Sequence, residues 1–168
     1  MSYVFCDFQF CFKPNKSIDM CTMILKEPVS YYVNDSSVYC TFLDGSKAFD
    51  WVEYSKLFRS FMTRKLPAVV LRMLCNMYVN SGARLQWNGV CSTVFAALNG
   101  VKQGGIISPI MFCVYIDNLL LSLAKSAVSC NIGNCFVDML AYADDIVLLA
   151  VPLQCVKCYV GVTRLLSS

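Results

Sequence analysis

Residues 136–151 read Phe-Val-Asp-Met-Leu-Ala-Tyr-Ala-Asp-Asp-Ile-Val-Leu-Leu-Ala-Val, two apolar runs on either side of a pair of acids. The runs Phe136–Tyr142 and Ile146–Val151 predict two strands joined by a tight turn at Ala143-Asp144-Asp145. Taken alone, two acids at a hairpin tip indicate only a polar turn. Because both flanking strands are apolar, we expect this turn to lie against a core. Like charges held there are costly unless a cation neutralises them, and oxygen ligands suit Mg²⁺.

A second carboxylate stands at the end of another predicted strand. Val38–Leu43 is a β-prone apolar run that stops abruptly at Asp44. A lone acid there is ordinarily a turn former or a helix cap. If this strand pairs with the hairpin, however, Asp44, Asp144 and Asp145 form one cluster. Such a cluster can hold two metal ions roughly 4 Å apart, the arrangement that stabilises entering and leaving oxygens in phosphoryl transfer.

The rest of the chain alternates helical and extended patterns. Apolar spacing predicts a helix over Val52–Lys65, and Pro67 can open another that runs to about Asn80. Asn88-Gly89 is a strong hairpin signal between the segments Arg84–Trp87 and Val90–Phe95. Ser108-Pro109 supplies a cap and first-turn proline for a long apolar helix to about Ser126. The fold class expected is α+β, with strands packed on helices.

A glycine-rich loop, Asn99-Gly100-Val101-Lys102-Gln103-Gly104-Gly105, precedes that last helix. Backbone N–H groups left free in such a loop favour phosphate. The pattern is common, so Lys102 and Gln103 are equally consistent with solvated surface residues.

The composition indicates more apolar surface than an ordinary soluble domain has. Of the 168 residues, 57% are apolar and only 15% charged, against about a quarter charged in ordinary soluble domains. We therefore expect apolar surface that something else covers. Asp117 and Asp144-Asp145 interrupt the longest apolar runs, so neither reaches the roughly 20 residues of a membrane span. Without a signal peptide either, we expect a cytoplasmic or nuclear protein.

The net charge of +3 is too small to indicate nucleic-acid binding by itself. Most of the eleven cysteines are expected to be reduced core residues. A zinc site remains open for one loose group, Cys130, Cys135, Cys155 and Cys158.

Three segments, in order, resemble the catalytic motifs of reverse transcriptases. Phe42-Leu43-Asp44-Gly45-Ser46-Lys47-Ala48-Phe49-Asp50 resembles the first. The segment from Gly100 to Gly104, followed by Ser108-Pro109, resembles the second, and Tyr142-Ala143-Asp144-Asp145 resembles the Tyr-X-Asp-Asp box. Upstream, Gln9 to Pro14 with Ser17 resembles the preceding fingers motif. The amino-acid sequences of these motifs are most similar to those of the non-LTR (LINE-like) retrotransposon branch.

The resemblance implies a role for each matching residue. Asp44, Asp144 and Asp145 would be the catalytic carboxylates and, with the carbonyl of Gly45, would bind two Mg²⁺ ions, which Mn²⁺ can replace. The nucleotide contacts would be Phe49, Lys102, Gln103 and Gly104, with Phe49 excluding a 2′-hydroxyl, although Phe49 is also consistent with a plain core ring. Tyr142 would touch the primer. The reaction would be attack of a primer 3′-hydroxyl on the α-phosphate of the nucleotide.

The resemblance also implies an architecture. Residues 1–38 would be a partial fingers region, and residues 39–168 a polymerase palm, an antiparallel sheet with helices packed on one face. The hairpin at 83–99 would lie near their boundary. We expect the thumb and the endonuclease of a longer polyprotein to be missing, and the isolated chain to be inactive or weak.

In the parent enzyme the partners would be an RNA template, a DNA primer and deoxynucleotide triphosphates, with no membrane. The alternative function is a non-catalytic, domesticated palm that binds nucleic acid or another protein. Three positions depart from the family: Cys11 replaces a usual glycine, Ile18 a common hydroxyl residue and Tyr54 a frequent histidine. We expect these changes to affect folding and template contact more than metal binding.

Overall fold

The structure is a computed structural model that describes residues 7–33, 37–126, 131–132, 135–136 and 139–150. The chain divides into two compact units, one formed by Met1–Ser46 with Ile116–Ser168 and the other by Lys47–Tyr115. These units are defined by compactness alone, and the division into fingers and palm at residue 38 stays a prediction.

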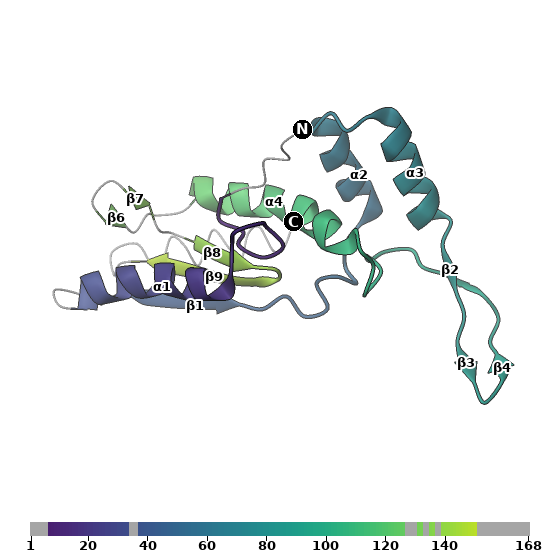
Figure 1. Cartoon of the computed structure of the whole chain (residues 1–168), viewed down its shortest axis with the longest axis horizontal. Coiled ribbons are helices and arrows are strands. Elements are labelled where there is room, and N and C mark those ends of the chain that lie inside the picture. The colour runs from purple at the N-terminus through teal and green to yellow at the C-terminus, as the bar shows by residue number, and fades with distance from the viewer. Residues whose placement is uncertain (1–6, 34–36, 127–130, 133–134, 137–138, 151–168) are drawn as a thin grey trace. The chain divides into compact units, whose positions relative to one another are not determined.

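A three-stranded antiparallel sheet organises the first unit. It consists of β1 (Tyr39–Leu43), β9 (Asp145–Ala150) and β8 (Met139–Tyr142), in the order β1-β9-β8 (Figure 1). All three elements match predicted strands, and the antiparallel α+β class is confirmed. The predicted strand Phe136–Tyr142 is shorter than expected, since Cys135–Phe136 forms the separate strand β7, which pairs with β6 (Asn131–Ile132).

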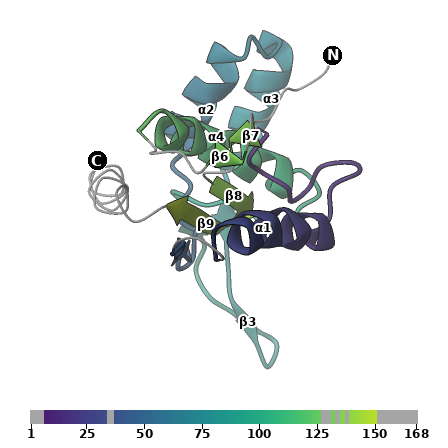
Figure 2. The same ribbon diagram turned by 90° about the vertical axis from the view of Figure 1, so that its left-hand side faces the viewer.

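Two helices flank this sheet. Helix α1 (Ile18–Val33) contacts β8, and Figures 1 and 2 show the sheet between α1 and the second half of α4 (Ser108–Ser126). The helices of this unit therefore lie on both faces, where one face was predicted. No helix was predicted over Ile18–Val33. The Ser17 hydroxyl accepts a hydrogen bond from the Met20 N–H at 3.2 Å, as an N-cap does.

The core of the first unit lies between the sheet and α4. Met139 and Ala141 on β8 and Ile146 and Leu148 on β9 are buried. Residues on a strand alternate between faces, so these four share one face of the antiparallel pair. The buried α4 side chains of this unit are Ile116, Asp117, Leu120 and Leu123. Helix α1 and a pocket lie on the opposite face of the sheet.

The second unit contains α2 (Tyr54–Thr63), α3 (Ala68–Val79), the first half of α4 and a long hairpin. Both helices match the predictions, with Pro67 preceding α3. In the hairpin, β2 (Gly82–Ala83) pairs with β5 (Phe95–Ala96), and β3 (Gln86–Trp87) pairs with β4 (Val90–Cys91). The predicted Asn88-Gly89 turn has φ values of +45° and +78°, as a type I′ turn requires.

Apolar surface is abundant, as the composition predicted. Large side chains that are more than three-quarters exposed include Ile106, Leu98 and Trp87. By length and composition alone, Ser108–Lys125 could cross a membrane, but half of that window is buried within the structure, as in core helices of soluble proteins. The zinc hypothesis lies outside the described residues, because Cys130, Cys155 and Cys158 and the side chain of Cys135 are not among them.

Candidate active site

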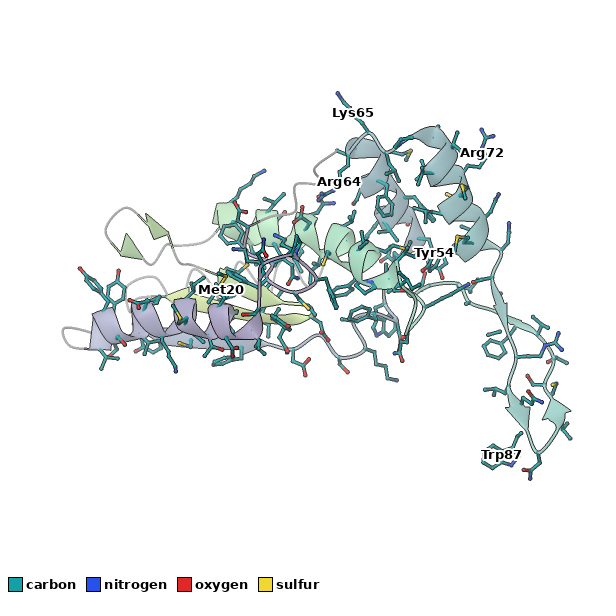
Figure 3. All side chains as sticks on the ribbon, viewed as in Figure 1. Met20, Tyr54, Arg64, Lys65, Arg72 and Trp87 are labelled. Carbon is teal, nitrogen blue, oxygen red and sulfur yellow. The ribbon has the colours of Figure 1, made fainter. Side chains whose placement is uncertain are left out.

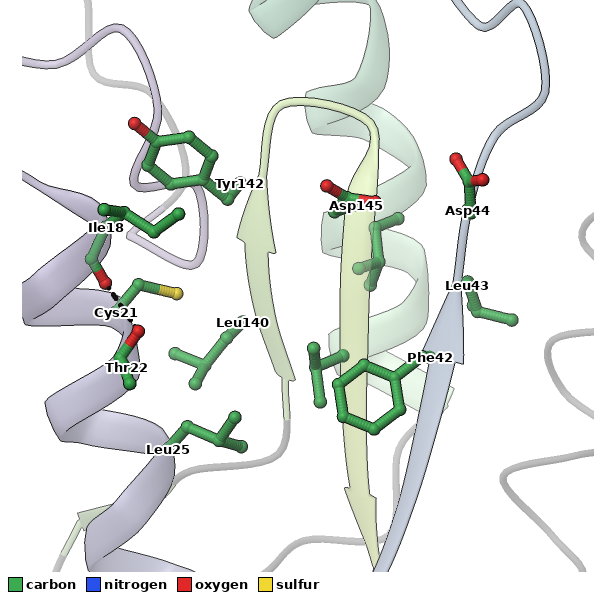
Figure 4. Close-up of a pocket in the computed structure, with 12 residues that line it drawn as sticks. Ile18, Cys21, Thr22, Leu25, Phe42, Leu43, Asp44, Leu140, Tyr142 and Asp145 are labelled. Atoms are coloured by element: carbon green, nitrogen blue, oxygen red, sulfur yellow. Dashed lines mark hydrogen bonds between the residues drawn. The ribbon is translucent and has the colours of Figure 1, made fainter.

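The sheet register brings two of the predicted carboxylates to one end of the sheet. Strands β1 and β9 pair as far as Leu43 and Ile146, so the next position on each strand is Asp44 opposite Asp145. Directly opposite residues of an antiparallel pair have Cβ atoms about 4.5–5.5 Å apart. Figure 4 shows the side chains of Asp44 and Asp145 together at this end. The predicted pairing of the two motifs is therefore present in the backbone.

The third carboxylate lies in the turn. Tyr142 pairs with Asp145, which leaves Ala143 and Asp144 as a two-residue loop. Asp144 is half-buried, whereas Asp44 and Asp145 are exposed. The expectation that this turn is packed against a core is thus wrong for Asp145, because the acids lie at the rim where the apolar strands end. Gly45, the predicted carbonyl ligand, is half-buried directly after Asp44.

The positions of the acidic side chains bear on the predicted metal site. Within the described ranges, no three Asp, Glu, Cys or His side chains are grouped as ligands of one metal ion. The structure brings Asp44 and Asp145 together but does not gather all three acids around a point. Two carboxylates on facing strands fit a hard divalent cation chemically, with Asp144 one residue away.

A pocket of about 360 Å³ opens beside these two acids, between α1 and the sheet face opposite the core (Figure 4). Asp44, Asp145 and Tyr142 form its polar rim, and Asp144 does not line it. The remaining lining is mainly apolar: Ile18, Cys21, Thr22, Leu25, Phe42, Leu43, Leu140, Ile146 and Val147. The alternation of the strands explains this lining, because Leu140, Val147 and Phe42 occupy facing positions in the register. The predicted primer-contacting residue, Tyr142, thus lies beside two of the predicted catalytic carboxylates.

Two protonated groups adjoin the rim. Burial raises the pKa of the Cys11 thiol, against a weaker opposing hydrogen bond from Tyr142. The pKa of the Tyr142 phenol is also raised, first by the negative charge that Cys11 carries when ionised and then by burial. Both groups therefore stay neutral at pH 7, and neither adds charge beside the carboxylates.

Gln9 belongs to this site, and sequence reasoning gave it no role. Its side chain is only 1% exposed, and it exchanges two hydrogen bonds with the peptide groups of Ala143 in the acidic turn. Gln9 begins the upstream segment that carries the family resemblance. That segment could have drawn attention to it, but no local pattern links residues 134 positions apart.

The four residues predicted to contact the nucleotide all lie in the second unit. Phe49 is half-buried and stacks on the buried ring of Phe112, with 4.2 Å between ring centroids and 13° between planes. One face of the ring thus packs against a buried side chain. Lys102 donates to the Met77 carbonyl at 3.4 Å, and its ammonium lies 5.5 Å from the centroid of the Tyr78 ring. Gln103 and Gly104 are exposed.

Lys102, Gln103 and Gly104 lie in a loop whose backbone conformation depends on glycine. Gly100 has φ of +88°, and a Cβ there would lie 3.0 Å from the backbone of Asp50. Gly104 also has a positive φ, +75°. The Ser108 hydroxyl at the start of α4 donates to the Lys102 carbonyl and so ties the loop to the helix. The predicted order of loop and helix is confirmed.

One family departure has a direct structural explanation. The Tyr54 hydroxyl donates to the Gly100 carbonyl at 2.9 Å, and its ring packs edge-on against Tyr78, 5.9 Å between centroids. Tyr54 therefore stabilises the glycine loop. Cys11 is buried in the first unit, and Ile18, the first residue of α1, is 56% exposed.

Comparison with known proteins identifies the family to which the sequence is similar. Residues 2–160 match the family model described as "Reverse transcriptase (RNA-dependent DNA polymerase)". The chain is 35% identical over 114 residues to the Pol polyprotein of the type-2 retrotransposable element R2DM of Drosophila melanogaster, covering 68% of this chain and 11% of that protein. Against the Pol polyprotein of the type-1 retrotransposable element R2 of Nasonia vitripennis, identity is 32% over 113 residues, 67% of this chain and 11% of that protein. The chain thus spans about a tenth of these relatives.

Proposed function

This chain belongs to the reverse transcriptase family, related to R2 non-LTR retrotransposon Pol proteins, and we propose that it carries the nucleotidyl-transfer site for RNA-directed DNA synthesis as part of a longer protein, inactive or weak by itself. A primer 3′-hydroxyl would attack the α-phosphate of a deoxynucleotide paired with an RNA template. The observation that carries the proposal is the register of β1 with β9, which sets Asp44 opposite Asp145 beside Tyr142. These residues come from two separate motifs about 100 positions apart in the sequence.

The family generally uses Mg²⁺. We assign Asp44 and Asp145 as the carboxylates that hold it, with Asp144 and the Gly45 carbonyl as further ligands; Mn²⁺ can replace it. Bound there, the metal would stabilise charge on the phosphoryl oxygens and orient the attacking hydroxyl. Asp145 lies on β9 and Asp44 directly follows β1, so the ladder that ends at Leu43 and Ile146 fixes the backbone from which both ligands project.

The chain's own side chains would position the other reactants. Tyr142, on the pocket rim, would contact the primer end. Phe49, Lys102, Gln103 and Gly104 would contact the incoming nucleotide, with the exposed residues 102–104 of the loop offering backbone N–H groups to its phosphates.

The charge distribution supports a nucleic-acid partner, although the net charge alone does not. Residues 47–115 carry eight Lys and Arg against two Asp and Glu, a formal charge of +6, whereas the rest of the chain has a charge of −3. Lys65, in the turn between α2 and α3, and Arg72, on α3, are both exposed (Figure 3). A locally basic surface attracts a phosphate backbone even when the whole chain is nearly neutral. The basic residues are Lys47, Lys56, Arg59, Arg64, Lys65, Arg72, Arg84 and Lys102.

The proposal is tested by Mn²⁺ binding, followed by electron paramagnetic resonance, and by Mn²⁺-dependent binding of a fluorescent deoxynucleotide triphosphate. In a variant with Asp144→Asn and Asp145→Asn, we expect both affinities to fall by about tenfold or more, because the charged ligands are lost. The control changes two exposed acids elsewhere, Asp7→Asn with Asp50→Asn, and should behave as wild type.

The same measurements separate the two candidate functions. Equal Mn²⁺ and nucleotide affinities in the wild type and the turn variant would refute the polymerase assignment. If oligonucleotide binding survived under those conditions, the chain would instead be a non-catalytic module that binds nucleic acid.

A further inference from the structure

The acidic turn is held by a side chain from the opposite end of the chain. The Ala143 N–H donates to Gln9 Oε1 at 3.0 Å, and Gln9 Nε2 donates to the Ala143 carbonyl at 3.1 Å. Gln9 Oε1 also accepts the Cys11 N–H at 3.0 Å. Both polar groups of one peptide position in the turn are therefore bonded to one buried amide.

The backbone around Gln9 is fixed to the same strand. Gln9 bridges Ala141 in parallel orientation, since the Phe10 N–H donates to the Ala141 carbonyl and the Ala141 N–H donates to the Phe8 carbonyl, each at 2.8 Å. Residues 8–10 thus lie along the free edge of β8. From there the Gln9 side chain reaches past the end of the strand to the turn.

The turn needs an external restraint because of its backbone conformation. Ala143 has φ of +58°, a left-handed conformation that alanine adopts at a cost and glycine adopts freely. This residue directly precedes Asp144 and Asp145. A change at Ala143 would therefore redirect both carboxylates, because each side chain follows its own backbone.

We propose that Gln9 is the positioning residue of the acidic turn: by bonding both peptide groups of Ala143, it holds the left-handed conformation that sets the directions in which the proposed metal ligands Asp144 and Asp145 project. The inference rests on the function proposed above and deepens it. Glutamine suits the role because its amide offers one acceptor and one donor, matching the N–H and the carbonyl. A glutamate carboxylate can only accept, and an apolar side chain removes the partner of both half-buried polar groups of Ala143.

The test uses Gln9→Met, which keeps the length of the side chain and removes every hydrogen bond it makes. The control is Gln86→Met, the same change at an exposed position in β3. The first measurement is backbone amide hydrogen exchange by NMR. We expect exchange at Ala143 to accelerate on the order of tenfold or more in Gln9→Met, with the central-strand amide of Leu148 unchanged.

The wild type provides a criterion that does not depend on the variant folding. If the Ala143 amide of the unaltered chain exchanges as fast as that of an unstructured peptide, the hydrogen bond to Gln9 does not exist and the proposal is overturned.

The second measurement is Mn²⁺ affinity, which we expect to fall on the order of tenfold in Gln9→Met but not in the control. Adding Ala143→Gly to Gln9→Met should restore part of it, because glycine adopts the left-handed conformation without help. If Gln9 contributed only packing, adding Ala143→Gly to Gln9→Met would not restore the Mn²⁺ affinity. Unchanged Mn²⁺ affinity in a folded Gln9→Met, or no recovery in the folded double variant, would contradict the inference.

The two measurements also distinguish failure of this inference from failure of the proposed function. If wild type and the Asp144→Asn, Asp145→Asn variant bound Mn²⁺ equally, the metal site would be wrong. Fast exchange at Ala143 in the wild type would instead remove the Gln9 contact alone.

Discussion

Replacing Gly100 with alanine should destabilise the second unit for two separable reasons. The first is conformational, since φ at this position is +88° and a left-handed conformation costs alanine about 1–2 kcal/mol. The second is steric. The added Cβ would lie 3.0 Å from both the Cα and the carbonyl oxygen of Asp50, and backbone atoms cannot rotate aside as a side chain can. Crowding of this kind costs about 1–3 kcal/mol.

Gly104→Ala isolates the first term. Gly104 lies in the same loop with φ of +75°, and no heavy atom would lie within 4 Å of its Cβ. We therefore expect Gly104→Ala to cost about 1–2 kcal/mol, and Gly100→Ala about 1–3 kcal/mol more. Because a change of 1 kcal/mol shifts Tm by about 2–4 °C in a domain of this size, the excess corresponds to a further fall of roughly 2–12 °C.

Both variants are compared with wild type by urea unfolding and by thermal unfolding followed by circular dichroism. Equal losses in the two variants would show that Asp50 does not crowd Gly100, and the close approach of the two loop segments would have to be abandoned. A smaller loss in Gly100→Ala than in Gly104→Ala would refute the conformational argument as well.

Three further expectations follow from other interactions. Tyr54→Phe removes the hydrogen bond to the Gly100 carbonyl and should lower the free energy of unfolding by about 0.5–1.5 kcal/mol, measured by urea titration; no change would mean that water replaces it. Burial raises the pKa of Cys11 above the ordinary thiol value of 9.0, so its contribution to stability is complete below pH 9 and is lost as pH rises through the higher folded-state pKa. The urea concentration at the midpoint of unfolding should therefore decrease as the pH rises above 9. It should decrease less in Cys11→Ala, and an identical pH profile in that variant would contradict this. Lys65→Glu should weaken binding of a single-stranded oligonucleotide and reduce the slope of log affinity against log salt by about 0.7 for each phosphate that the protein no longer neutralises, whereas Lys26→Glu in α1 should not; equal effects would argue against a basic surface confined to residues 47–115.

Much of the sheet and of the candidate site follows from local sequence pattern. The runs before Asp44 and on both sides of Asp144-Asp145 are apolar and stop at acids, so the strands and the end at which the acids project are readable. The register that sets Asp44 opposite Asp145 was not readable from those runs. The sequence predicted a cluster of acids only if the two segments pair, and the structure shows that β1 and β9 do pair.

The remaining features depend on interactions that no window of sequence contains. Helix α1 was missed because it includes Pro28, which usually ends a helix, and because its apolar residues do not follow a clear helical period. The exposure of Asp145 was predicted wrongly, since apolar strands say nothing about how far the turn extends beyond the core. Gln9 resembles any polar residue until the fold brings it to Ala143.

The central position of β9 has a consequence for how the molecule is made. During synthesis, β1 emerges roughly 100 residues before its partner, a delay of about 5–20 s at ordinary rates of translation. The β8–β9 hairpin can close within microseconds once made, but the earlier strand must wait with its ladder groups unpaired. The nascent polypeptide is thus most prone to aggregate in that interval, and a ribosome-associated chaperone would protect it most effectively at β1.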